Sequence, residues 1–168
     1  MRYHNITKDD MLNGCGLRVV LWLAGCEHHC KGCQNPITWN PDGGQLFTAK
    51  EIDEIFAELE KDHVSGITFS GGDPLHPLNR HMVYNIAKIA QQAHPEKTVW
   101  MYTGYTWEEI IESEELLAIM EVVDVLVDGK FEESLLDKNA KWVGSTNQRV
   151  IDVTKSLKRG GVVLYESN

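Results

Sequence analysis

Strand-like and helix-like segments alternate along this chain, and the alternation limits its fold more than any other feature. Residues 17–24 are apolar and β-branched, which predicts a buried strand. Thr48 and Glu51 form a capping-box pair ahead of a helical apolar repeat. We expect further strands at 66–70, 98–103 and 122–127, helices at about 82–94 and 106–120, and weaker strands at 149–153 and 161–165. This order is typical of βαβ units and predicts an α/β fold with mostly parallel strands.

The length of 168 residues restricts the sheet further. A complete eight-stranded barrel takes about 250 residues, and about 200 is near the minimum. The chain has room for five or six βα units, so we predict an incomplete (βα)5-6 barrel or an open sheet. No internal repeat or linker interrupts the pattern, and we expect one domain over residues 1–168.

The charge and hydropathy of the chain exclude several classes of protein. A net charge of −9 disfavours binding to nucleic acid or to an anionic membrane. The apolar run at 19–24 is far shorter than a membrane span, and the N-terminus has no secretory signal, so we expect a cytoplasmic protein. Residues 141–168 hold five Lys and Arg against two Asp and Glu. This basic segment is either solvated surface or a contact for an acidic group.

Four loops with reactive or flexible residues follow the first four expected strands. They are 25–33, with its cysteines, the Gly-Gly-Asp-Pro sequence at 71–74, Thr-Gly-Tyr at 103–105, and Asp-Gly-Lys at 128–130. Loops after parallel strands meet at one edge of the sheet. The sequence therefore predicts a pocket at that edge.

Cys26, Cys30 and Cys33 have the spacing C-x3-C-x2-C, which lets one short loop bind a single metal centre. A structural zinc ion needs a fourth ligand, for which Cys15, His28 and His29 are candidates. A cubane iron–sulfur cluster held by three cysteines leaves one iron open to a substrate. Both alternatives remain open on these residues alone. We expect His28 and His29 to be exposed loop residues.

Several segments together resemble the radical S-adenosylmethionine enzymes, and more narrowly the activating proteins of glycyl-radical enzymes. Among these, the chain is most similar to the branch that serves anaerobic (class III) ribonucleoside-triphosphate reductase. The resemblance spans about residues 3–153 and leaves 154–168 as a basic C-terminal tail. It rests on Asn13–Arg18, Gly25–Asn35, Thr38–Trp39, Ser70–Pro77, Trp100–Tyr105, Val125–Phe131 and Gly144–Arg149.

The resemblance implies a [4Fe-4S] cluster on Cys26, Cys30 and Cys33, with S-adenosylmethionine on the open iron. One electron, from a donor such as flavodoxin, would release a 5′-deoxyadenosyl radical. That radical would take hydrogen from a glycine of the reductase large subunit, with no separate catalytic side chain. The alternatives are an activator of a formate-lyase-type enzyme and a non-catalytic zinc or iron–sulfur interaction module.

The resemblance also implies which residues contact S-adenosylmethionine. Backbone groups at Gly71 and Gly72 would approach the ligand, and Asp73 occupies the acidic position of that loop. Gly32 stands where many members carry an aromatic residue, so the backbone from Gly32 to Gln34 would meet the adenine. Lys130, beside Asp128, would pair with the methionine carboxylate. The remaining expected contacts are Thr103 and Tyr102 on ribose or methionine, with Asn147 and Arg149 at the rim and Cys15 outside the site.

Overall fold

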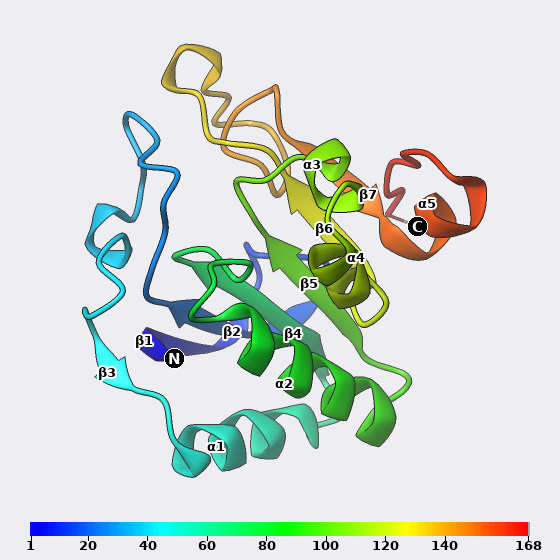
Figure 1. Ribbon diagram of the computed structural model, residues 1–168. Helices are drawn as coiled ribbons and strands as arrows, with labels where there is room; N and C mark the ends of the chain where they lie inside the picture. Colours follow the sequence, from blue (N-terminus) through cyan, green and yellow to red (C-terminus); the bar gives the residue numbers. More distant parts are fainter. Residues whose placement is uncertain (168) are drawn as a thin grey trace.

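The computed structural model describes residues 1–167, which form a mixed α/β fold around one seven-stranded sheet (Figure 1). The strand order is β3-β1-β2-β4-β5-β6-β7. The four central strands are mutually parallel: β2 (Leu17–Leu23), β4 (Val64–Gly71), β5 (Thr98–Tyr102) and β6 (Val125–Asp128). The flanking strands are antiparallel to their neighbours: β1 (Arg2–Asp10), β3 (Gln45–Leu46) and β7 (Arg149–Asp152). Within these residues β3 and β7 are unpaired edges, so the sheet is not closed.

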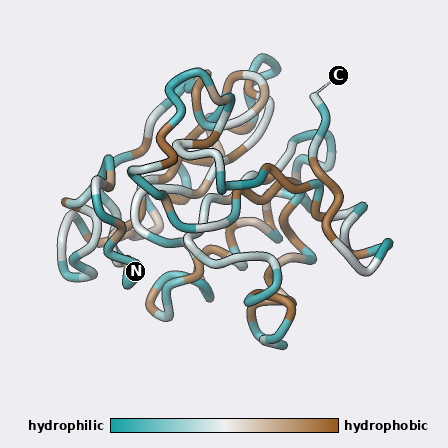
Figure 2. The backbone as a smooth tube through the Cα atoms, turned by 90° about the horizontal axis from the view of Figure 1, so that it is seen from above, coloured by the Kyte–Doolittle hydropathy of each residue, from teal (hydrophilic) through white to brown (hydrophobic). Residues whose placement is uncertain are grey.

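The two faces of the sheet are covered differently. Alternate strand residues such as Leu21, Phe69 and Met101 pack in the main core with helix residues such as Ile55 and Ile86. Four helices lie over this face in Figure 1: α1 (Ala49–Leu59), α2 (Arg80–Ala93), α3 (Trp107–Ile111) and α4 (Glu114–Met120). The opposite face carries a smaller cluster of Trp100, Val125 and Val127 with Cys15, Tyr102, Trp142, Val143, Val150 and Tyr165. Viewed from above, several of the outermost turns are hydrophilic (Figure 2).

Two helices begin at capping boxes. The box predicted at Thr48 and Glu51 is confirmed at α1, and Thr106 and Glu109 form another at α3. The single helix expected over 106–120 is wrong, because the chain breaks after Ile111 and restarts at Ser113. The Ser113 hydroxyl accepts a hydrogen bond from the Leu116 N–H and so begins α4 as a new helix.

The expected strands are largely confirmed, with two differences. β7 forms at 149–152 but runs antiparallel to β6. Residues 161–165 form no strand; their only ladder contact is a single bridge between Leu164 and Ile151. The part of the chain expected as a tail instead contains α5 (Val153–Arg159), whose Val153 and Ser156 are buried. Val163 and Tyr165 then bond to the backbone of β7.

β1 is not predicted from the sequence. Its residues, RYHNITKDD, are mostly polar, and only Tyr3 among them is fully buried. The strand forms because β2 offers it an antiparallel partner from Tyr3 opposite Leu23 to Asp10 opposite Arg18, with register shifts after Tyr3 and after Thr7. Tertiary pairing therefore overrides a weak local signal.

Two long loops rise from the same end of the sheet. One follows β2 and contains the cysteines and the short η1 turn (Pro36–Thr38); the other joins β6 to β7 through η2 (Glu133–Leu135). Figure 1 shows both beyond the carboxyl ends of the parallel strands. Every helix in residues 1–167 is too short or too polar to cross a membrane.

Candidate iron–sulfur site

The three clustered cysteines lie on the loop that follows β2, at the carboxyl end of the parallel strands. The Gly25 and Cys26 N–H groups donate to the carbonyls of Thr38 and Trp39 at 2.7 and 3.1 Å. The Cys33 N–H donates to the Cys30 carbonyl at 3.1 Å. These bonds close the base of the loop and fold its tip into a turn.

The thiols fit an iron–sulfur cluster by their chemistry. All three are unpaired and half-buried. Burial raises the pKa of the Cys26 thiol to about 11, because its thiolate loses solvation that bound iron would replace. The Asn35 N–H points at Cys33 Sγ over 3.4 Å, in position to stabilise sulfur charge.

The arrangement differs from that of a single-ion site. Across residues 1–167, no three His, Cys, Asp or Glu side chains gather as ligands of one metal ion would. In a cubane each thiolate binds a different iron, so the ligands lie farther apart than around zinc. Three thiolates on one loop match the ligand set of a cubane that leaves one iron open.

Gly71 and Gly72 bring the end of β4 against the start of the cysteine loop. The Gly72 and Asp73 N–H groups donate to the Leu23 and Gly25 carbonyls at 2.8 and 2.7 Å. A Cβ at Gly72 would lie 2.5 Å from the Gly25 carbonyl oxygen, and Gly71 has a φ of +95°. The two glycines are thus required by a close approach of two backbone segments.

Asp73 is buried and its carboxylate joins three loops. It accepts hydrogen bonds from the Leu75 N–H at 2.8 Å and the Gly104 N–H at 3.0 Å. The Thr103 hydroxyl reaches its two oxygens at 3.0 and 2.9 Å. His28 Nε2 lies 2.7 Å from Asp73 Oδ2. Groups of the protein therefore already form hydrogen bonds to both carboxylate oxygens of Asp73.

The prediction of an exposed His28 is wrong. The side chain of His28 is only 9% accessible, and its ring packs edge-on against Tyr105. His29 meets the expectation of exposure, and its ring contacts Trp39. The sequence does contain a signal for the contact between His28 and Asp73. His28 lies between two clustered cysteines, and the loop after the next parallel strand carries the acidic Asp73.

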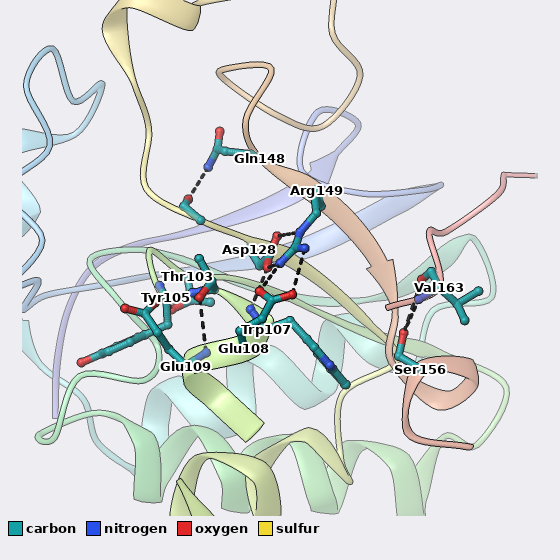
Figure 3. A network of polar contacts seen from close by, with 12 residues as sticks. Thr103, Tyr105, Trp107, Glu108, Glu109, Asp128, Gln148, Arg149, Ser156 and Val163 are labelled. Carbon is teal, nitrogen blue, oxygen red and sulfur yellow. Dashed lines mark hydrogen bonds and ion pairs between the residues drawn. The ribbon is translucent and has the colours of Figure 1, made fainter. Parts of the chain in front are cut away.

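Asp128 forms a second buried junction (Figure 3). Arg149 donates to both of its oxygens, at 3.1 and 2.5 Å, and the Trp107 N–H donates at 2.8 Å. Arg149 also bonds both oxygens of Glu108, at 3.1 and 2.7 Å. These two carboxylates raise the pKa of Arg149 through charge-assisted hydrogen bonds. Asp128 thus ties the end of β6 to the starts of α3 and β7.

Two neighbouring cavities flank Lys130, which is exposed. One, of about 500 Å³, is also lined by Cys30, Lys31 and residues 131–134. The other, of about 470 Å³, is also lined by Gly104, Asp128, Asn147 and Arg149. Lys130 therefore lies between the cysteine loop and the ends of β5 and β6, as expected for a residue at the predicted edge.

The remaining expected contacts lie at different depths. Gly32 and Gln34 are exposed on the cysteine loop, and Gly32 faces Glu133 of the β6–β7 loop. Tyr102 packs against Trp100 on the sheet face away from the helices. Its buried hydroxyl has no hydrogen-bond partner among residues 1–167, and burial raises its pKa. Cys15 lies in the same Trp100 cluster, away from the loop of three cysteines.

Comparison with known families defines the class of protein first. A model described as "4Fe-4S single cluster domain" matches residues 12–151, so the chain belongs to the 4Fe-4S single-cluster proteins.

The similar curated proteins narrow this class. An anaerobic ribonucleoside-triphosphate reductase-activating protein of Enterobacteria phage T4 is 43% identical, over 89% of this chain and 93% of its own. Proteins with the same name from Vibrio cholerae and Escherichia coli K12 are 39% and 40% identical, over 88% and 89% of this chain and 96% and 97% of theirs. The chain belongs to the family of anaerobic ribonucleoside-triphosphate reductase-activating proteins.

Proposed function

We propose that this protein is an enzyme that installs a glycyl radical on anaerobic ribonucleoside-triphosphate reductase. One observation carries the proposal: three unpaired cysteines share a loop at the carboxyl end of the parallel strands, in a chain that belongs to this activating family. Cys26, Cys30 and Cys33 hold a [4Fe-4S] cluster, and S-adenosylmethionine is the second cofactor. Bound together and reduced by one electron, these cofactors supply the radical chemistry that removes hydrogen from a glycine of the partner.

The protein residues bind and orient these cofactors. Lys130 is exposed between two cavities and one of these includes Cys30, which supports it as the partner of the methionine carboxylate. The exposed backbone at Gly32 and Gln34 is available to the adenine. Gly71 and Gly72 hold the cysteine loop close, where a ligand on the open iron would meet them. Asp73, Thr103 and Asp128 act in this proposal by holding the loops, since their polar atoms are bonded to protein groups.

We also propose a fold type, a cellular compartment and an electron donor for this protein. The unclosed sheet with its four parallel central strands supports an incomplete (βα)5-6 barrel of the radical S-adenosylmethionine type, proposed as a single domain over 1–168. Three unpaired thiols on one loop favour the reducing cytoplasm. The electron donor is then a small cytoplasmic redox protein such as flavodoxin.

Anaerobic reconstitution tests the function. We expect a brown protein with about four irons per chain. When reduced, it cleaves S-adenosylmethionine and produces a glycyl radical signal in electron paramagnetic resonance after incubation with the reductase. A colourless protein with one bound zinc, or cleavage without a radical on the reductase, contradicts the proposal.

The cysteine assignment has a matched control within the chain. Cys30→Ala should abolish both the cluster and the cleavage of S-adenosylmethionine. Cys15→Ala should keep both, because Cys15 packs beside Trp100 on the sheet face opposite the helices. Iron content and cleavage rate are measured for both variants, and loss of the cluster in Cys15→Ala alone would show that the ligand set is wrong.

A further inference from the structure

We propose that His28 is a positioning residue that locks the cluster loop onto the loops after β4 and β5. This inference rests on the proposed function for its role in catalysis. The lock is the hydrogen bond from His28 Nε2–H to Asp73 Oδ2, over 2.7 Å. It joins the stretch between Cys26 and Cys30 to a carboxylate that also holds Thr103 and Gly104.

The space for the His28 ring is built by glycine. A Cβ at Gly104 would lie 2.3 Å from His28 Cδ2 and 2.6 Å from its Cγ, so only glycine leaves room for the ring. The φ of Gly104 lies outside the left-handed region, so this glycine is required by the packing of His28 and not by its own backbone. Tyr105 covers the ring edge-on at 4.7 Å between centroids.

Within residues 1–167, the ion pairs of the other side chains of the loop's tip are exposed on at least one side. Lys31 and Glu133 pair at 3.2 Å, but the Lys31 side chain is 91% exposed, and exposed ion pairs contribute little. Glu27 lies 3.8 Å from His76 and is also exposed. The contact of His28 with Asp73 is buried on both sides, at 9% and 2% side-chain exposure. It is the buried ion-pair contact among those described for residues 27–33, and we infer that it holds the loop in place.

The consequence concerns the thiols on either side of His28. Because Cys26 and Cys30 lie two residues before and after it, a fixed His28 fixes the spacing of two cluster ligands. Outer groups that orient metal ligands typically change metal affinity or activity by about 10- to 100-fold when removed. His28 acts through this spacing, without touching the reacting atoms.

A pair of identical substitutions at adjacent residues tests the lock. His28→Asn shortens the side chain so that its amide falls short of Asp73, whereas His29→Asn makes the same change at the exposed neighbour. We expect His28→Asn to lose iron to a chelator about tenfold faster than the wild type. His29→Asn should match the wild type. His28→Gln, whose amide nitrogen lies as many bonds from the backbone as Nε2, should restore the slow rate.

The protein without a cluster provides a second readout. Lys31 lies at the exposed tip of the loop, where trypsin can cut, and a loop held in place by His28 should be cut more slowly than a loosened one. We expect His28→Asn to be cut there faster than the wild type and than His29→Asn. If His28→Asn and His29→Asn are cut at the same rate and lose iron at the same rate, the proposed role of His28 is wrong. A wild-type protein that binds no cluster would contradict the proposed function, while the cutting rates would still decide the role of His28.

The glycine provides a double-mutant test. Gly104→Ala in the wild type should expel the His28 ring and raise the rate of cutting at Lys31, as His28→Ala does. In a His28→Ala background the added methyl group enters vacated space, so Gly104→Ala should cause no further increase. Independent, multiplicative effects of the two substitutions would show that Gly104 does not serve His28 and would contradict the proposal.

Discussion

At the scale of single residues, Asp73 and Asp128 are the two buried carboxylates that organise the site. Each sits at the carboxyl end of the sheet and accepts several hydrogen bonds from other loops. Of the two, Asp128 has the arginine partner within residues 1–167: the guanidinium of Arg149 donates hydrogen bonds to both of its carboxylate oxygens. Removing one member of such a pair leaves the other charged and desolvated.

Because Arg149 is the charged partner of the buried Asp128, its removal should destabilise the protein. Arg149→Met should lower the free energy of unfolding by about 2–3 kcal/mol, since Asp128 would keep only the Trp107 N–H as a partner. Glu108→Gln removes the exposed side of the same network and should cost less than about 1 kcal/mol. Urea unfolding at neutral pH measures both. Equal losses would mean that the bond to Asp128 is not the stabilising one.

The residue types of the site could be predicted from sequence, but their partners could not. The spacing of Cys26, Cys30 and Cys33 and the glycines at 71 and 72 are local signals. His28 and Asp73 are 45 residues apart, and Asp128 and Arg149 are 21 apart. Such pairs form because neighbouring strands of the sheet bring distant loops together. The residues near each partner in the sequence do not indicate this arrangement.

At the scale of elements, local capping chemistry explains where helices begin. At α1, Glu51 Oε2 accepts from the Thr48 N–H and hydroxyl, each at 2.7 Å, and Glu51 Oε1 accepts from the Tyr3 hydroxyl. These hydrogen bonds lower the pKa of Glu51 below its ordinary value of 4.5. The capping box was predictable because both partners lie within four residues, whereas β1 depends on its pairing with β2.

The lowered pKa of Glu51 predicts an acid dependence of stability. Its stabilising effect is fully present above pH 4.5 and is lost as the pH falls through the lower pKa of the folded state. Glu51→Gln should therefore be less stable than the wild type at pH 7, and this difference should shrink at pH 3. Asp53→Asn, at an exposed position of the same helix, is the control. Thermal unfolding at both pH values measures the differences, and a constant gap for Glu51→Gln would contradict the assignment.

At the scale of the whole molecule, helices cover one face of the sheet, and a small aromatic cluster with the C-terminal segment covers part of the other. Trp100, Trp142 and Tyr165 stack edge-on, with centroids 5.0 to 5.8 Å apart. The alternation of strands and helices and the length of the chain were sufficient to predict a parallel centre and an unclosed sheet. The antiparallel flanks were not predictable, because the mostly polar sequence of β1 does not indicate a strand and the four residues of β7 do not indicate a direction.

An unclosed sheet predicts that the partner completes the site. Because β3 and β7 are free edges within residues 1–167, the described strands do not close around the carboxyl end of the sheet. We expect a second protein docked there to exclude water from the bound cofactors. We therefore expect slow cleavage of S-adenosylmethionine by the reduced protein alone and faster cleavage with the reductase present. The rate of 5′-deoxyadenosine release measures this, and a reductase whose target glycine is replaced by alanine separates docking from hydrogen transfer. If docking closes the site, the alanine protein should still accelerate the first turnover; equal rates with and without either partner would show that the chain encloses its own site.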